Sequence, residues 1–179
     1  MGYEIPGGLG VKLAEPDREV VVMVGDGTYL MMNSEIVTAV AEGIRITIVV
    51  VDNHGYQCIL GLQRAVGVAD FGNELRFRDE KEGAPAGDYV PVDFKKHAES
   101  MGALSIFATT SGEVKAALEQ ARKADRIAVV VVPVDPESRM PGMGTWWDVP
   151  VAEVSSADQT KTTRVNYEEA TKKQRPVLA

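Results

Sequence analysis

The residues best suited to chemistry are a Gly-Asp-Gly triplet at 25–27, directly after an apolar run, and Asn53, which follows a second apolar run and Asp52. The residues between them, 28–52, are enough for one helix and one strand, and a βαβ unit brings the ends of its parallel strands side by side. We therefore expect Asp26 and Asn53 to meet at the carboxyl edge of a parallel sheet, where such sheets bind ligands. One carboxylate, one amide oxygen and nearby backbone carbonyls suit Mg²⁺ or Ca²⁺ rather than zinc.

The two glycines give this edge a second capability. Gly25 and Gly27 allow a tight turn and a close approach of the backbone to a ligand, and the following helix start can offer N–H groups to phosphate oxygens. Since Mg²⁺ completes its octahedron with phosphate and water, the pattern predicts a Mg²⁺-bridged diphosphate. The alternative is a plain Gly-Asp-Gly turn, with Asn53 as the cap of the next helix; the spacing and the flanking apolar runs favour the site.

The triplet, the gap and the asparagine resemble the cofactor motif of thiamine diphosphate enzymes. The segment MGYEIPGGLGVKLAEPDREVVVMVGDG is similar to the acetolactate synthase and glyoxylate carboligase branch, and the resemblance covers roughly residues 1–135. The stretches YLMMNSEI, VVVDNHGYQCI and WWDVPVAEVS resemble the trihydroxycyclohexanedione acylhydrolases of inositol catabolism more closely.

This resemblance implies thiamine diphosphate and Mg²⁺ as cofactors. Asp26, Asn53 and the backbone carbonyl of Gly55 would be the protein ligands of the metal, although Gly55 would also suit a simple turn. The N–H groups of Gly27 and Thr28 would hold diphosphate oxygens, and the Thr28 hydroxyl would either assist or cap the turn.

Residues beside these ligands have roles that the sequence leaves open. Met1 would support the bent cofactor, as a bulky residue does at this place in the family, or it is a plain start methionine. His54 would face the active site or be structural. Tyr56 and Gln57 would border the cofactor or the substrate, because they follow the metal loop directly. Cys58, in an apolar helix, is expected to be a packed small hydrophobe rather than a nucleophile.

The resemblance also implies partners outside this sequence. The glutamate that activates the cofactor belongs to another domain in the family, usually of a second subunit, and we assign no catalytic residue here. We expect the chain to be a fragment of a three-domain enzyme, inactive by itself and part of a homo-oligomer that acts on a small-molecule substrate. Of Trp146 and Trp147, one would cover the site and the other contact another domain, or both pack within the tail.

The reaction implied by the closer resemblance is hydrolysis of a ring C–C bond in a cyclic 1,2-dione. One alternative is a carboligase of the acetolactate synthase or glyoxylate carboligase type. Another is a phosphate-binding α/β module without activity, which would show no preference for thiamine diphosphate over ADP.

Composition restricts the other classes. A hydrophobic content of 45% and a charged content of 25% are ordinary for a globular domain. The net charge of −7, with no basic stripe, argues against nucleic acid and anionic membranes as partners. One cysteine excludes an intrachain disulfide and fits a cytoplasmic setting. No apolar run approaches the roughly 20 residues that span a bilayer.

The order of elements predicts an α/β fold, a three-layer α/β/α sandwich with a mostly parallel, doubly wound sheet. We expect a cofactor-binding domain over 1–135 and a tail over 136–179 that packs on it or closes the site. The polar, Gly-rich residues 70–89 predict a loop or lid. The expected strands are 19–24, 45–51, 103–107 and 127–132, and the expected helices are 7–14, 34–42, 56–64, 93–101, one capped by Ser111, and an amphipathic segment near 167–174.

Overall fold

The structure is a computed structural model that describes residues 1–138 and 148–174. The described strands form one sheet in the order β1-β2-β4-β3, and each neighbouring pair is parallel. Parallel strands covered on both faces require nearly continuous apolar residues, which is the pattern of this chain. The strands are β1 (Val21–Gly25), β2 (Thr47–Asp52), β3 (Leu104–Phe107) and β4 (Ala128–Pro133).

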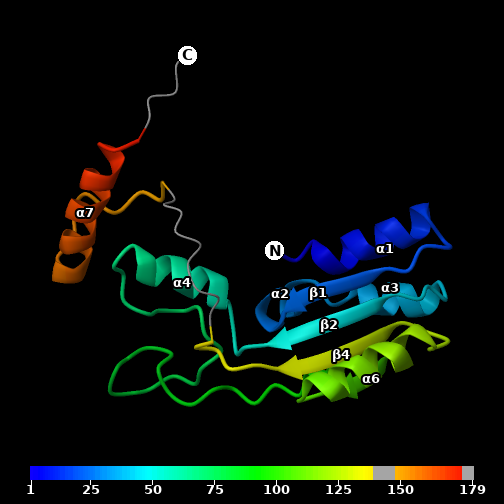
Figure 1. The fold of residues 1–179 in the computed structure, drawn as a ribbon. Coiled ribbons are helices and arrows are strands. Elements are labelled where there is room, and N and C mark those ends of the chain that lie inside the picture. Colours follow the sequence, from blue (N-terminus) through cyan, green and yellow to red (C-terminus); the bar gives the residue numbers. More distant parts are fainter. Residues whose placement is uncertain (139–147, 175–179) are drawn as a thin grey trace.

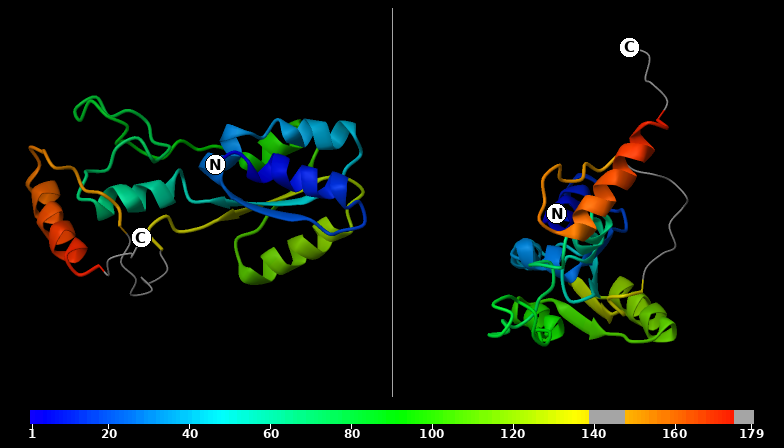
Figure 2. Two further views of the ribbon diagram at one scale, coloured as in Figure 1. Left: turned by 90° about the horizontal axis from the view of Figure 1, so that it is seen from above. Right: turned by 90° about the vertical axis from the view of Figure 1, so that its left-hand side faces the viewer.

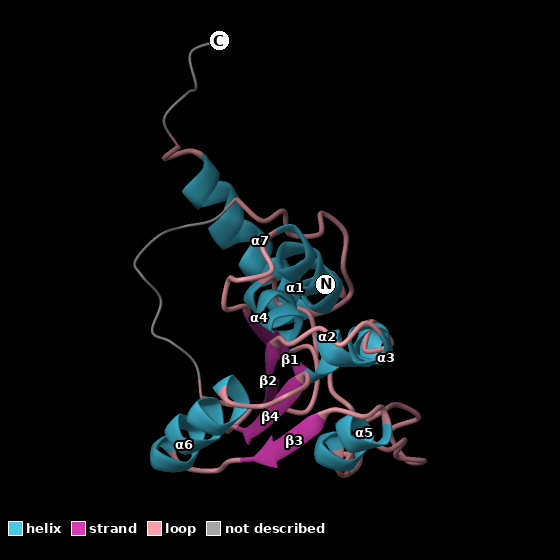
Figure 3. Ribbon diagram, turned by 90° about the vertical axis from the view of Figure 1, so that its right-hand side faces the viewer, coloured by secondary structure: helices cyan, strands magenta, loops and turns pink. Residues whose placement is uncertain are grey.

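Helices cover both faces of this sheet (Figure 3). α6 (Ser111–Arg122) lies on one face, while α2 (Asp26–Met31), α3 (Glu35–Ala41) and α5 (Phe94–Ser100) lie on the other. α1 (Glu4–Ala14) packs against β1 and α3. The predicted three-layer α/β/α fold with a parallel, doubly wound sheet is therefore confirmed.

Buried side chains of the core hold the strands of the sheet in place. Ile36 of α3 and the strand residues Ile48, Val50 and Val129 are completely buried in one cluster. Full burial of each such side chain stabilises the fold by about 1.5–3 kcal/mol. A smaller cluster joins α6 to Val130. β4 is thus packed on both faces, while β2, from which the Asn53 loop begins, is packed mainly through the larger cluster.

Three further parts of the chain lie beyond the carboxyl ends of the strands (Figures 1 and 2). They are α4 (Gln57–Ala65), the long segment that follows it, and α7 (Asp158–Thr171). α7 is attached to the end of α4, because the buried Thr160 hydroxyl donates a 2.6 Å hydrogen bond to the carbonyl of Gly67. Residues 70–89 contain no helix or strand, as predicted, and only isolated β-bridges occur there.

Several element bounds differ from those predicted, for local reasons. α6 is capped by Thr110 rather than Ser111, because Thr110 and Glu113 form a reciprocal capping box. α1 begins at Glu4 instead of Gly7. α7 is longer and earlier than the segment expected near 167–174. Among the described residues, no helix is long and apolar enough to cross a bilayer. The domain division at 135 stays a prediction.

Candidate functional site

Two neighbouring strands bring the predicted metal ligands to one edge of the sheet. β1 ends at Gly25, and Asp26 begins α2 at once; β2 ends at Asp52, and Asn53 follows. Gly25 lies opposite Val51 in the strand register, so the two strands end at nearly the same level. The sequence spacing has therefore placed the carboxylate and the carboxamide side by side, as predicted.

A carboxylate, a carboxamide and a main-chain carbonyl converge at this point. The side-chain oxygen of Asn53 lies 2.9 Å from Oδ1 of Asp26 and 3.0 Å from the carbonyl oxygen of Gly55. All three atoms are acceptors, so the arrangement is favourable only with a cation among them, or after the carboxamide turns over and donates its N–H groups to both neighbours. One carboxylate, one carboxamide and one carbonyl form the donor set that Mg²⁺ accepts, so these residues fit the predicted ion.

Asp26 is also buried without a complete set of partners. Its side chain is 0% exposed, and within the described residues Oδ2 has no hydrogen-bond partner. Burial raises the pKa of Asp26 to about 6 and the nearby Asp52 carboxylate raises it further, against the backbone N–H groups of Gly27, Gly55 and Asn53, which lower it. A buried carboxylate with an oxygen that accepts no hydrogen bond lowers the stability of the fold unless a cation compensates its charge.

The described residues hold no group of three or more His, Cys, Asp or Glu side chains that could bind a metal. A site of one carboxylate, one carboxamide and one main-chain carbonyl contains a single side chain of these types, so it would not form such a group. Softer metals, which favour thiolate and imidazole ligands, would find no such cluster in the described residues.

The start of α2 leaves no room for a side chain at Gly27. A Cβ there would lie 2.8 Å from the ring of Tyr56, so the ring covers this glycine directly. The N–H groups of Gly27 and Thr28 belong to the first turn of the helix, where main-chain donors lack partners within the helix. A Cβ at Gly25 would meet nothing within 4 Å, which leaves open space beside the predicted diphosphate position.

The loop that carries the third ligand has an unusual backbone. His54 has a φ of 63° and Gly55 a φ of 147°, a region that favours glycine. A Cβ at Gly55 would lie only 2.3 Å from the carbonyl oxygen of Asn73. Glycine is therefore required at 55 both for its backbone conformation and for the close approach of residues 73–75.

His54 and Gln57, predicted on the substrate side, contact the segment after α4. The His54 ring stacks on Tyr89 with a centroid distance of 4.3 Å and an interplanar angle of 18°. Gln57 is 7% exposed, and its Nε2 donates to the carbonyl of Asn53 at 3.1 Å and to Oε1 of Glu74 at 3.4 Å. Gln57 thus connects the loop of residues 53–55 to Glu74 through hydrogen bonds. Part of the His54 side chain remains exposed.

Sequence reasoning missed four residues near the site. Asp52 lies directly before Asn53, its side chain is 13% exposed, and Oδ1 accepts a 3.4 Å hydrogen bond from the N–H of His54; its place at a strand end was a usable signal. The other three residues, Glu74, Arg76 and Tyr89, come from the irregular segment, where no periodic pattern points to them.

The remaining predicted residues have mixed outcomes. Met1 is 64% exposed at the amino end, which lies beside α2 (Figure 1). His97 lies away from these residues, and its Nδ1 is 3.0 Å from the hydroxyl of the buried Tyr29. The prediction that Cys58 is packed was wrong, because its side chain is exposed. The predictions for Trp146 and Trp147 lie outside the described residues.

Residues 1–132 match the family described as "Thiamine pyrophosphate enzyme, C-terminal TPP binding domain". A 3D-(3,5/4)-trihydroxycyclohexane-1,2-dione hydrolase from Geobacillus thermodenitrificans is 41% identical over 169 residues, which cover 94% of this chain and 26% of the relative. A protein of the same name from Clostridium perfringens is 43% identical over 158 residues, covering 88% and 25%. The chain therefore spans about a quarter of the length of these curated relatives.

Solved structures show the same fold. A thiamine diphosphate-dependent 4-hydroxybenzoylformate decarboxylase from Rhodococcus jostii aligns with a TM-score of 0.61 at 23% identity, over 75% of this chain and 23% of its own. A benzoylformate decarboxylase from Polynucleobacter necessarius gives a TM-score of 0.58, also at 23% identity, over 76% and 23%. The superfamily predicted from the Gly-Asp-Gly and Asn53 spacing is confirmed by the family match.

Proposed function

The chain belongs to the family of C-terminal thiamine pyrophosphate-binding domains of thiamine pyrophosphate enzymes, and we propose that it anchors this cofactor through a Mg²⁺ ion. The observation that carries the proposal is the convergence of the Asp26 carboxylate, the Asn53 carboxamide and the Gly55 carbonyl, with the Asn53 side chain 2.9 and 3.0 Å from the other two. The fully buried Asp26 carboxylate, with an oxygen that no described group satisfies, supports a cation at the same place.

Each residue of the site has a distinct part in this proposal. Asp26 supplies the negative charge, while the Asn53 carboxamide and the Gly55 carbonyl complete the protein ligands. The N–H groups of Gly27 and Thr28 bind diphosphate oxygens that also reach the ion.

Two more residues border the cofactor in this account. The ring of Tyr56, which covers Gly27, limits how the diphosphate is seated, and Met1, at the amino end beside α2, would support the bent cofactor. When bound, thiamine diphosphate supplies the carbon that adds to a substrate carbonyl, and the protein supplies binding and orientation. The role of this chain is to hold the diphosphate end in a fixed position.

For the full-length protein we infer hydrolysis of a C–C bond in a cyclic 1,2-dione. This inference is supported by the names of the two relatives and by their 41% and 43% identity with the chain. The rest of the polypeptide would supply the group that activates the cofactor, and a second subunit would complete the site. The substrate would be a small polyhydroxylated ring, and the isolated chain would be inactive.

An activity assay on the full-length protein tests this proposal. Ring opening of a trihydroxycyclohexane-1,2-dione should require thiamine diphosphate and Mg²⁺, and Asp26→Ala should abolish it. Pyruvate offered as the alternative substrate distinguishes a carboligase. Condensation of pyruvate without ring opening of the dione would overturn the proposed reaction while leaving the cofactor site intact. Turnover by the Asp26→Ala variant would contradict the proposed site itself.

A further inference from the structure

The conformation of the Gly55 loop is held by a segment far from it in the sequence. The N–H of Tyr56 donates to the carbonyl of Asn73 at 2.6 Å, and the N–H of Leu75 donates to the carbonyl of His54 at 2.8 Å. Gly55 and Glu74 form an antiparallel bridge between these two bonds. The carbonyl that is proposed to bind the metal therefore belongs to a loop fixed by main-chain bonds on both of its sides.

Glu74 is the residue that anchors this support. Its Oε1 accepts hydrogen bonds from the hydroxyl of Tyr89 at 2.8 Å and from Nε2 of Gln57 at 3.4 Å. Its Oε2 accepts one from Nε of Arg76 at 2.9 Å. The Glu74 side chain is only 12% exposed. A carboxylate this buried, with charge-assisted partners on both oxygens, holds one geometry more firmly than a solvated one.

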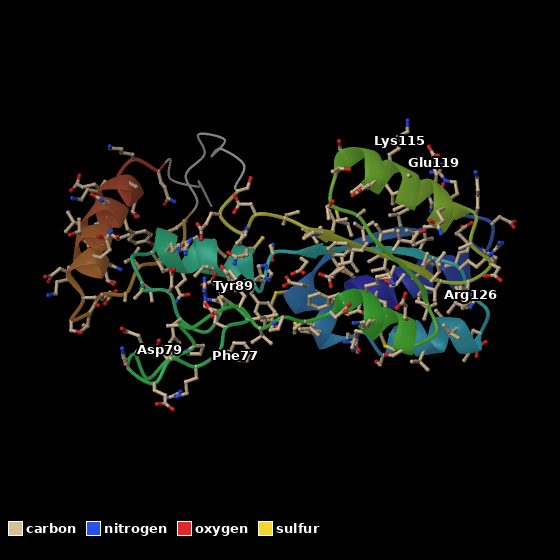
Figure 4. All side chains as sticks on the ribbon, turned by 90° about the horizontal axis from the view of Figure 1, so that it is seen from below. Phe77, Asp79, Tyr89, Lys115, Glu119 and Arg126 are labelled. Atoms are coloured by element: carbon tan, nitrogen blue, oxygen red, sulfur yellow. The ribbon has the colours of Figure 1, made fainter. Side chains whose placement is uncertain are left out.

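Two partners of Glu74 also contact the loop of residues 53–55. Gln57, which donates to Glu74, also donates to the carbonyl of Asn53 at 3.1 Å. Tyr89 stacks on the ring of His54, and the guanidinium of Arg76 lies 3.8 Å from the Tyr89 ring centroid. Figure 4 shows Tyr89 beside α4, whereas Asp79 lies far out on the same segment. Both flanks of Gly55 are thus connected through one carboxylate.

We propose that Glu74 is a positioning residue for the Mg²⁺ site, which it holds in shape through Gln57, Tyr89 and the backbone of residues 73–75 without touching the ion. The proposal rests on the proposed function, since it presupposes that Asn53 and Gly55 bind the metal. Groups in this outer position fix the orientation of metal ligands, and their loss typically lowers metal affinity about 10–100-fold.

The test uses the full-length protein and two matched variants. Glu74→Gln keeps the size of the side chain but removes its charge and weakens the bond to Arg76. Glu80→Gln makes the same change of charge at an exposed position of the same segment. Thiamine diphosphate binding is followed by calorimetry over a series of Mg²⁺ concentrations, and the melting temperature of each metal-free protein is measured in EDTA.

The proposal predicts that loss of the Glu74 charge weakens Mg²⁺ binding but not the binding of thiamine diphosphate at saturating Mg²⁺. Glu74→Gln should raise the Mg²⁺ concentration for half-maximal binding about tenfold or more, and Glu80→Gln should leave it unchanged. At saturating Mg²⁺ the affinity of Glu74→Gln for thiamine diphosphate should match that of the wild type, because the diphosphate donors on α2 are intact. Tyr89→Phe, which removes one donor to Glu74, should shift the Mg²⁺ requirement in the same direction by a smaller factor.

Two results would overturn the inference in different ways. A normal Mg²⁺ requirement in Glu74→Gln, with or without a lower melting temperature, would reduce Glu74 to a structural residue while leaving the proposed function untouched. Wild-type protein that binds thiamine diphosphate equally well without Mg²⁺ would instead overturn the proposed function, and the role of Glu74 with it.

Discussion

Replacing Asp26 by asparagine should make the metal-free chain more stable while abolishing Mg²⁺-dependent cofactor binding. The carboxylate is fully buried, and burial raises its pKa from 3.8 to about 6. The folded state therefore holds the proton more tightly than the unfolded chain does, so ionisation of Asp26 opposes folding. This rise of the pKa from 3.8 to about 6 corresponds to about 3 kcal/mol. Asparagine keeps the shape of the side chain without this charge.

The contribution of Asp26 to the free energy of unfolding should fall as the pH rises. Because the pKa of folded Asp26 lies above that of the unfolded chain, the contribution to stability is complete below pH 3.8 and is lost as the pH rises through about 6. In EDTA, urea unfolding at pH 7.5 should show Asp26→Asn to be more stable than the wild type by up to about 3 kcal/mol. The gain should shrink towards zero near pH 4.

Asp17→Asn, at an exposed position, is the matched control, with the same change of formal charge. It should show no comparable gain at pH 7.5. A wild-type chain as stable as Asp26→Asn at pH 7.5, or a gain that is equal at both pH values, would refute the reasoning that burial of this carboxylate without a cation opposes folding.

Three further substitutions test the Gly55 loop, the buried core and the exposed surface one at a time. Gly55→Ala should unfold at a lower urea concentration than the wild type and lose Mg²⁺-dependent binding, because its Cβ would meet the carbonyl of Asn73 at 2.3 Å. Normal binding in this variant would contradict the loop geometry. Tyr29→Phe should lower the free energy of unfolding by about 1–2 kcal/mol, since it removes the buried bond to His97, and leave the Mg²⁺ requirement unchanged. Cys58→Ser should change neither stability nor binding by calorimetry, because the thiol is exposed; a large loss would restore the packed role first predicted.

The part of the site that was predictable from sequence is the part that local chain geometry determines. Asp26 and Asn53 directly follow apolar strands, and a parallel βαβ unit allows few ways to arrange those strand ends. Their juxtaposition therefore follows from spacing alone. Gly55 was identified by resemblance, and the structure adds the physical reason, a left-handed backbone in contact with Asn73.

The part that was missed depends on contacts distant in sequence. Glu74 and Tyr89 lie in a segment without regular periodicity, so no pattern could indicate that their side chains support residues 53–57. Cys58 was misjudged for a related reason. Its helix projects beyond the ends of the strands, so the face that carries Cys58 has no sheet to pack against, although the helix itself was predicted correctly.

Metal-dependent anchoring at the ends of β1 and β2 is best tested by a calorimetric titration of the full-length protein with thiamine diphosphate, with and without Mg²⁺. Binding should require Mg²⁺ in the wild type and be lost in Asp26→Ala, because the only carboxylate among the proposed ligands is then absent. Binding that does not depend on Mg²⁺, or that persists in Asp26→Ala, would contradict the claim that these strand ends anchor the diphosphate through a metal ion.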